Sequence, residues 1–208
     1  MHRSRFSPTT LLAAIVVLAG TVTVAGCRQD DGPAHADTTS ASTAATTARD
    51  TALENFRRDL PAVTALTGGA TSRDELVAGF VRAVETSDTT ALRGLVLGRA
   101  EFAYLYYPSS RYVAAPYRLD PQLLWFLMQQ NSEKGIVRVL RRYGGHDLAM
   151  ESYACPGAPE REVRNTLWGD CTVRFRPSGA DGAQELRLFG SILERDGRYK
   201  FVGYSNDF

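Results

Sequence analysis

The sequence predicts an α+β fold, in which N-terminal helices pack on a C-terminal antiparallel sheet within a single domain. The first observation is a change of period: apolar residues recur at helical spacing before Gly144-Gly145 and alternate with polar residues after it. The second is Asp196-Gly197, a strong signal for a two-residue hairpin, because that turn needs positive φ at both central positions. Helices followed by an antiparallel sheet are typical of an α+β domain.

Two helices are expected near the start of this domain. Ser72 and Glu75 have the spacing of a capping box, in which each side chain accepts a hydrogen bond from an exposed backbone amide. Apolar residues at helical spacing then extend the helix over about 73–86. Asp88 can cap a second, short helix that ends near Val96.

Two more helices are expected after a stretch without clear periodicity. Asp120-Pro121 is a helix start, because proline suits the first helical position, and a run of apolar residues follows it. A further helix is expected over about 132–143 and should end at Gly144-Gly145. By default such helices cover a core.

The C-terminal third is expected to form an antiparallel meander of about four strands. Alternation of buried and exposed positions predicts strands at 171–176, 185–195 and 198–204. A turn is expected at 178–182. The Asp196-Gly197 turn sets the register of the last two strands, so that Ile192 should face Phe201 and Glu194 should face Tyr199.

Residues 1–27 contain a basic front, a short apolar run and small residues before a cysteine. Arg3 and Arg5 precede an apolar run over 11–19, and Val24-Ala25-Gly26-Cys27 follows. This arrangement resembles the signal peptide and lipobox of bacterial lipoproteins. The resemblance implies a signal peptide over 1–26, cleavage after Gly26, and a lipid anchor on Cys27 that holds the protein on the extracytoplasmic side of the cell envelope. The alternative is an ordinary signal peptide with a chance cysteine.

Composition divides the rest of the chain. Residues 27–50 comprise the lipidated cysteine and an Ala/Thr/Ser-rich stretch without a large apolar residue, which predicts a disordered tether. Residues 51–208 are expected to form the domain, with a cone-like core over about 72–208. In Gram-negative lipoproteins, Arg28-Gln29 after the cysteine would favour the outer membrane over the inner one.

The charge balance of the mature chain argues against a nucleic-acid partner. Loss of Arg3 and Arg5 with the signal leaves 22 basic against 23 acidic residues. Nucleic-acid binding proteins usually carry a basic stripe, and this sequence has none. The expected partners are therefore the membrane, a small apolar ligand, an envelope protein or a second copy of the chain.

The order of elements resembles the nuclear-transport-factor-2-like superfamily, also called the ketosteroid-isomerase-like or cystatin-like cone. The resemblance spans Ser72 to Phe208, and it rests on 74–97 and on the closing strands 186–193 and 199–204. It implies helices that close a cone made by a curved sheet. Two helices between Pro121 and Tyr143 exceed the usual pattern, so another α+β arrangement, with helices on one face of an antiparallel sheet, is the alternative.

Cys155 and Cys171 are the cysteines that remain once Cys27 is lipidated. The implied export brings both to an oxidising compartment, which predicts a disulfide bond between them. A reactive or metal-binding pair is the alternative, but the sequence offers neither a nearby histidine nor a Cys-x-x-Cys spacing. No metal or cofactor motif is present, so neither is expected.

Three residues are candidates for catalysis, because enzymes of the cone superfamily place an acid or a histidine inside the cone to move protons. His146 is the one histidine within 51–208, and its structural alternative is a surface residue at a strand edge. Asp88 has the alternative role of a helix cap, and Glu101 that of a solvated side chain.

Aromatic residues gather where the mouth of the cone would lie. The candidates for ligand binding are Tyr104, Tyr106, Tyr107, Tyr112 and Trp125. Tyrosine combines apolar area with a hydroxyl group, which suits a ligand pocket or an interface. The alternative is that Phe102, Tyr106 and Trp125 pack between the helices and the sheet.

Three functions remain open from the sequence. We expect most of all a non-catalytic module that binds a ligand or peptide near residues 104–125. The alternative is an envelope assembly or protein-interaction domain that dimerises through its sheet face, for instance through Phe189 or Tyr204. An isomerase-like or hydrolytic enzyme that uses His146, Glu101 or Asp88 has the least support.

Overall fold

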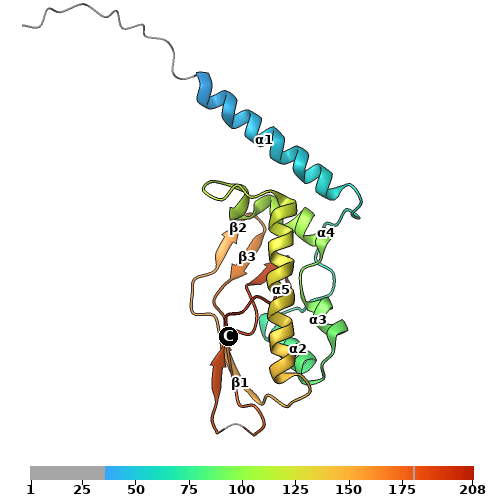
Figure 1. The fold of residues 1–208 in the computed structure, drawn as a ribbon, viewed down its shortest axis with the longest axis vertical. Coiled ribbons are helices and arrows are strands. Elements are labelled where there is room, and N and C mark those ends of the chain that lie inside the picture. The colour runs from blue at the N-terminus through green and yellow to red at the C-terminus, as the bar shows by residue number, and fades with distance from the viewer. Residues whose placement is uncertain (1–35, 180) are drawn as a thin grey trace, which may run out of the picture.

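The computed structural model describes residues 36–179 and 181–208, with side chains from Thr43 onward. It confirms the α+β class, with helices in the N-terminal part and antiparallel sheets in the C-terminal part (Figure 1). The expected signal peptide, Cys27 and residues 28–35 of the expected tether lie outside the described residues. Within the described ranges, no helix combines the length and the hydropathy needed to cross a membrane.

The helices cover the N-terminal two thirds of the described chain. The α-helices are α1 (Ala36–Arg57), α2 (Arg73–Glu85), α3 (Thr89–Leu95), α4 (Arg99–Glu101) and α5 (Pro121–Tyr143). Between α4 and α5 lie the π-helical turn η1 (Phe102–Tyr106) and the 3₁₀ turns η2 (Tyr107–Ser109) and η3 (Arg111–Val113). In Figure 1, α5 runs along the length of the domain, with the strands to one side and α2, α3 and α4 to the other.

One of the two hydrogen bonds of the predicted capping box is present at the start of α2. The Ser72 hydroxyl accepts a hydrogen bond from the Glu75 amide at 3.0 Å. The Glu75 carboxylate, however, reaches one residue further back and accepts from the amide of Thr71 at 2.8 Å. Both orphan amides are satisfied, so the helix begins where the sequence predicts.

The prediction of two helices between residues 121 and 143 is wrong, because α5 is continuous. Its polar middle suggested a break, but that segment is where the helix contacts the C-terminal end of the chain. The buried Ser132 hydroxyl accepts from the Tyr204 amide at 3.0 Å. The Asn206 side chain in turn donates to the Gly135 carbonyl at 3.1 Å. Polar residues at this level of α5 therefore anchor the C-terminal segment instead of ending the helix.

The expected tether up to residue 50 also needs correction, because α1 begins at Ala36. Residues 28–50 were expected to be disordered because they lack large apolar residues, and most of this helix does lack them. Six alanines, the residue of highest helix propensity, favour a helix without them. Phe56 attaches the C-terminal end of α1 to the domain, with its ring 5.6 Å from that of Phe102.

The strands form two antiparallel sheets. They are β1 (Met150–Ala154), β2 (Glu160–Glu162), β3 (Asn165–Trp168), β4 (Thr172–Phe175), β5 (Gln184–Leu186), β6 (Ile192–Arg195) and β7 (Arg198–Phe201). One sheet has the order β1-β4-β5 and the other the order β2-β3-β6-β7. The predicted strand over 185–195 is therefore interrupted between β5 and β6, and the sequence analysis assigned no strand to β1, β2 or β3.

The two sheets follow one meander of the chain. In one sheet, β1 pairs with β4 and β4 pairs with β5. In the other sheet, β2 pairs with β3 and β3 pairs with β6. Each of the three consecutive chain segments 150–162, 165–175 and 184–195 therefore contributes one strand to each of these sheets. The last hairpin has the predicted register, with Ile192 opposite Phe201 and Glu194 opposite Tyr199. Asp196 and Gly197 both have positive φ, as its turn requires.

The predicted disulfide bond is confirmed between Cys155 and Cys171. It lies at the level where the meander passes from one sheet to the other. Ala154, the last residue of β1, pairs with Thr172, the first residue of β4, and the disulfide bond follows directly beyond that pair. The bond therefore ties together two chain runs where their backbone pairing stops.

The core has two parts. In the first, Phe80 of α2 packs against the sheets, with its ring 5.3 Å from that of Phe189 and 5.5 Å from that of Phe201. Phe189 and Tyr204 are both buried there, so neither offers an exposed sheet face to a second copy. The second part joins the end of α1 to the η1–η2 segment through residues such as Phe102.

Candidate functional site

A cleft opens between the η1–η3 segment, the first half of α5 and the residues next to β6. It has a compartment of about 390 Å³ and a neighbouring one of about 320 Å³. The two share part of their lining, namely Tyr106, Tyr112, Gly190, Ser191 and Ser205. This shared lining places the two compartments next to each other, and each volume is within the size range of small-molecule sites.

The first compartment is polar. Its ionisable residues are Arg111, Glu160, Glu162, Asp170 and Arg187. Arg111 comes from η3 and Glu160 and Glu162 from β2, whereas Asp170 and Arg187 lie where the meander changes sheets. Five charges therefore converge on a concave surface from segments far apart in the sequence.

The second compartment is mainly apolar. Its apolar side chains are Leu119, Leu124, Leu127, Met128 and Val202. Leu124, Leu127 and Met128 lie on one face of α5 at helical spacing. The helix therefore presents one apolar face to this compartment.

Glu162 is the most unusual group in the cleft. Its side chain is buried, with only 9 % of the residue exposed. One carboxylate oxygen accepts from the Arg111 amide at 3.0 Å, while the other is buried and has no hydrogen-bond partner in the described part of the chain. Burial raises the pKa of Glu162, and the nearby charge of Glu160 adds to that rise, against the opposing hydrogen bond and charge of Arg111.

The other charges of the polar compartment have ionic partners. Arg187 contacts the carboxylates of Asp170 at 3.3 Å and Asp207 at 3.4 Å. Arg111 lies 3.6 Å from Glu160. The Arg187 Nε atom is buried without a hydrogen-bond partner among the described residues, but its guanidinium charge is balanced. Glu162 is thus the carboxylate of this compartment that has no ion pair.

Two of the five predicted ligand-binding residues, Tyr106 and Tyr112, line the cleft. Tyr106 is almost fully buried, and burial raises the pKa of its hydroxyl group. Tyr112 is partly exposed, and its hydroxyl accepts from the Arg111 guanidinium at 3.4 Å. Both residues contribute to the polar and the apolar compartments, so they lie at the boundary between them.

The other three predicted ligand-binding residues pack elsewhere. The Tyr107 hydroxyl donates to the Leu119 carbonyl at 2.8 Å. Trp125 lies against Phe102, with ring centroids 5.1 Å apart, and the ring of Tyr104 lies beneath the guanidinium of Arg57. These contacts hold the helices together, which is the core-packing alternative for this part of the aromatic cluster.

The three catalytic candidates do not form one buried site. His146 is exposed in the turn after α5, not in a strand. Asp88 is exposed and caps α3, where it accepts from the amides of Thr90 and Ala91, both at 2.9 Å. Asp88 therefore has the structural role that was its alternative.

Glu101 is buried, so the expectation that it is solvated is wrong. Its carboxylate accepts from Lys200 at 2.8 Å, from the Thr67 amide at 2.7 Å and from the Gly98 amide at 2.7 Å. Burial alone would raise the pKa of Glu101, but these hydrogen bonds and the charge of Lys200 outweigh it and lower that pKa. A carboxylate so fully bonded is a structural element and has no oxygen left for a substrate.

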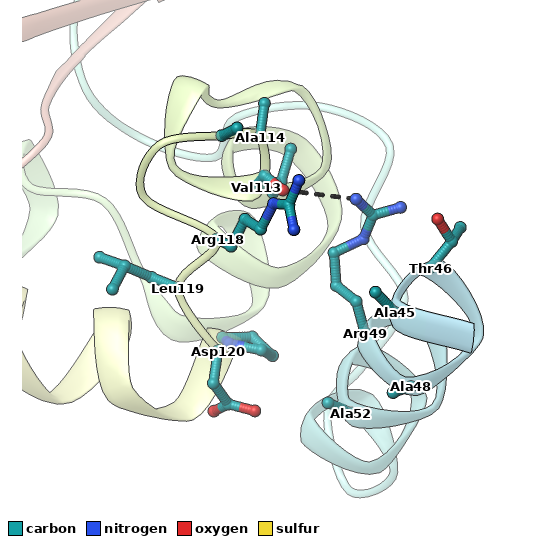
Figure 2. Close-up of a pocket in the computed structure, with 12 residues that line it drawn as sticks. Ala45, Thr46, Ala48, Arg49, Ala52, Val113, Ala114, Arg118, Leu119 and Asp120 are labelled. Atoms are coloured by element: carbon teal, nitrogen blue, oxygen red, sulfur yellow. Dashed lines mark hydrogen bonds between the residues drawn. The ribbon is translucent and has the colours of Figure 1, made fainter. Parts of the chain in front are cut away.

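A second cavity, of about 460 Å³, lies between α1 and the loop before α5 (Figure 2). Its α1 wall is built mainly of small side chains such as Ala48 and Ala52. Figure 2 shows Arg49 reaching from α1 to the Val113 carbonyl, a hydrogen bond of 3.4 Å. The Asp120 carboxylate in its wall is occupied as the cap of α5. Because Arg49 and Asp120 serve the fold in this way, we place the candidate site in the first cleft.

Sequence reasoning missed Glu162 and Arg187. Glu162 is the last residue of a Glu-Arg-Glu segment, and three consecutive charged residues predict an exposed segment. The sequence pattern does not indicate that the third of these side chains is buried. Arg187 lies at the interruption between β5 and β6, which alternation alone did not predict. Among the described residues, no group of three or more His, Cys, Asp or Glu residues could hold a metal ion.

No protein-family model, curated protein or solved structure matches this chain.

Proposed function

We propose that this protein is a membrane-anchored extracytoplasmic lipoprotein whose domain binds a small amphipathic ligand in the cleft, without catalysing a reaction on it. The observation that carries the proposal is a polar and an apolar compartment that lie next to each other and share lining residues. A ligand with a polar end and an apolar end would satisfy both compartments at once. The catalytic candidates give no support to an enzyme, since Asp88 and Glu101 have structural roles and His146 is exposed.

The anchor is proposed from residues 1–27, in which the basic front, the apolar run and Cys27 resemble a lipoprotein signal. The disulfide bond between Cys155 and Cys171 is compatible with an oxidising, extracytoplasmic compartment. The parent chain should incorporate radiolabelled palmitate in the expressing cell and the Cys27→Ser chain should not, as measured by autoradiography after immunoprecipitation. Absence of label from the parent chain would contradict the anchor.

We also keep the cone superfamily as part of the proposal. The helices before the meander and the register of the closing hairpin support it. In such a cone, a ligand lies between the sheet and the helices that cover it, which is how the present cleft is bounded. The continuous α5 removes the additional helix that had departed from the superfamily pattern.

Binding can be tested with Nile red, a neutral probe whose fluorescence rises in apolar surroundings, on the chain from Arg28 onward. Met128→Glu places a charge in the apolar compartment, where the Met128 side chain is partly buried, and should weaken binding by at least about tenfold, because an unpaired charge is costly there. Phe126→Glu is the matched control, because Phe126 is an exposed neighbour on α5 and is not part of the cleft lining. Equal binding by both variants and the parent chain would contradict the proposal.

The alternative, an assembly domain that dimerises through its sheet face, has less support. Phe189 and Tyr204, the residues expected to mediate it, are buried inside the domain. The exposed apolar side chains Leu123, Phe126, Leu127 and Val137 lie on α5 instead. A concentration-dependent mass in analytical ultracentrifugation, abolished by Phe126→Glu, would support an assembly role through α5 and not through the sheets.

A further inference from the structure

We propose that the amphipathic ligand of the cleft carries a cationic amine at its polar end, and that Glu162 is the group that binds it. This inference rests on the proposed function and specifies the class of ligand.

The first step is the charge balance. The polar compartment has three carboxylates and two guanidinium groups in its lining. The Arg187 guanidinium is held between Asp170 and Asp207, and Arg111 is held by Glu160. Glu162 remains without an ionic partner, so the group that would complete the compartment is a cation.

The second step is the carboxylate itself. One Glu162 oxygen is occupied by the Arg111 amide, while the other is buried and lacks a donor. A buried acceptor without a partner is costly, and a ligand that supplies an N–H donor removes that cost. An ammonium group also supplies the charge, and a hydrogen bond between two charged groups is stronger than one between neutral groups.

The third step is the surroundings. Tyr106 lines the cleft with Glu162, and the charge of Glu162 adds to the rise that burial causes in the pKa of the Tyr106 hydroxyl, so the two groups lie near each other. Aromatic faces attract ammonium groups. The adjoining compartment of Leu119, Leu124 and Leu127 would take an alkyl or aryl chain attached to the amine. A small hydrophilic cation or a polyamine would leave that apolar surface unfilled.

The test compares three probes of equal chain length, decylamine, decanol and decanoate, on the chain from Arg28 onward by isothermal titration calorimetry below their micelle concentrations. Decylamine should bind at least about tenfold more tightly than decanol, which is the effect of one charge-assisted hydrogen bond. Glu162→Gln keeps the shape of the side chain and should abolish that preference, while binding of decanol changes less than about twofold. The preference should also fall as the pH drops and Glu162 is protonated.

Glu185→Gln is the matched control. Glu185 is an exposed carboxylate on β5 that accepts from the Thr172 hydroxyl and lies outside the lining of both compartments, so its removal should leave the amine preference in place. Equal affinities for decylamine and decanol would overturn this inference while leaving the proposed function intact. Tighter binding of decanoate would overturn it in favour of an anionic ligand at Arg187. Failure of all three probes to bind would contradict the proposed function itself.

Discussion

Two buried glutamates of this protein have opposite environments. Glu101 accepts several hydrogen bonds and forms an ion pair with Lys200, and together these interactions lower its pKa. Glu162 accepts one hydrogen bond, from a backbone amide, and its pKa is raised. A buried carboxylate stabilises a fold only when its charge is compensated. We therefore assign Glu101 to the structure of the domain and Glu162 to its site.

Loss of the cation at Glu101 should destabilise the protein strongly. Lys200→Met leaves the Glu101 carboxylate buried without its counterion, and we expect the free energy of unfolding to fall by about 3–5 kcal/mol. Urea denaturation measures this change. Arg174→Met is the control, because it breaks the exposed pair between Arg174 and Glu151, 2.9 Å apart, and should cost less than about 1 kcal/mol. Similar losses in both variants would contradict the structural role of the buried pair.

Glu162→Gln should stabilise the protein at neutral pH. A carboxyl group whose pKa is raised in the folded state contributes stability below its unfolded pKa, about 4.3, and loses that contribution as the pH rises through the folded pKa. The glutamine variant should therefore unfold at a higher temperature than the parent at neutral pH, and this advantage should shrink as the pH is lowered toward about 4. Thermal unfolding followed by circular dichroism at both pH values tests the sign. A glutamine variant that is less stable at neutral pH would show that the Glu162 charge is compensated.

Asp88 should behave as a helix cap and not as a catalytic group. Asp88→Ala removes the acceptor for the amides of Thr90 and Ala91, so we expect a loss of about 0.5–2 kcal/mol in the free energy of unfolding. Asp88→Asn keeps an acceptor oxygen and should lose much less. Chemical denaturation of the two variants tests the role of Asp88 as a cap. If the negative charge of Asp88 were needed, asparagine would be as harmful as alanine.

At the scale of elements, the sequence predicted those parts whose signals are local. The cap at Ser72 begins α2, Asp88 begins α3, and Asp196-Gly197 sets the final hairpin, each through backbone bonds made within a few residues. The errors depend on distant contacts. α5 continues through its polar middle because Ser132 bonds to Tyr204, and no local pattern contains that partner.

The close approach of α5 to the C-terminal segment should make Gly135 intolerant of any side chain. A Cβ atom at Gly135 would lie 1.7 Å from the Tyr204 carbonyl oxygen, so Gly135→Ala should cost about 1–3 kcal/mol or more through forced displacement of the backbone. Gly94 in α3 is the matched control, because a Cβ there meets no atom within 4 Å. Gly94→Ala should stabilise the helix by about 0.5–1 kcal/mol, and thermal denaturation compares the two. A gain in both variants would contradict the contact.

The disulfide bond should contribute a large part of the stability of the sheets. Its cysteines are separated by 16 positions, for which restriction of the unfolded chain predicts about 3 kcal/mol. The double variant Cys155→Ala and Cys171→Ala should therefore unfold at a lower urea concentration than the parent. The parent treated with a reductant is the control and should approach the double variant. An unchanged midpoint would contradict a stabilising role of the bond.

At the scale of the whole molecule, the candidate site could be predicted only in part. Tyr106 and Tyr112 belong to an aromatic cluster that is visible in the sequence, and both line the cleft. Glu162 and Arg187 reach the same cleft from the sheet side, and their positions depend on how the two sheets are arranged. A cluster of aromatic residues can be seen in the sequence itself. The burial of a charged side chain and the identity of its ionic partners depend on the complete fold.

The helix α1 has a mechanical consequence for the lipid anchor that we propose at Cys27. Its 22 residues make a rod of about 33 Å at 1.5 Å per residue, with Phe56 fixing one end to the domain. Such a rod sets both the distance and the azimuth of the domain relative to Ala36, the first residue of the helix, because each residue added turns the far end by about 100°. An insertion of seven residues, close to two full turns, would lengthen the reach and preserve the azimuth. An insertion of two residues would leave the reach almost unchanged and point the mouth of the cleft in nearly the opposite direction.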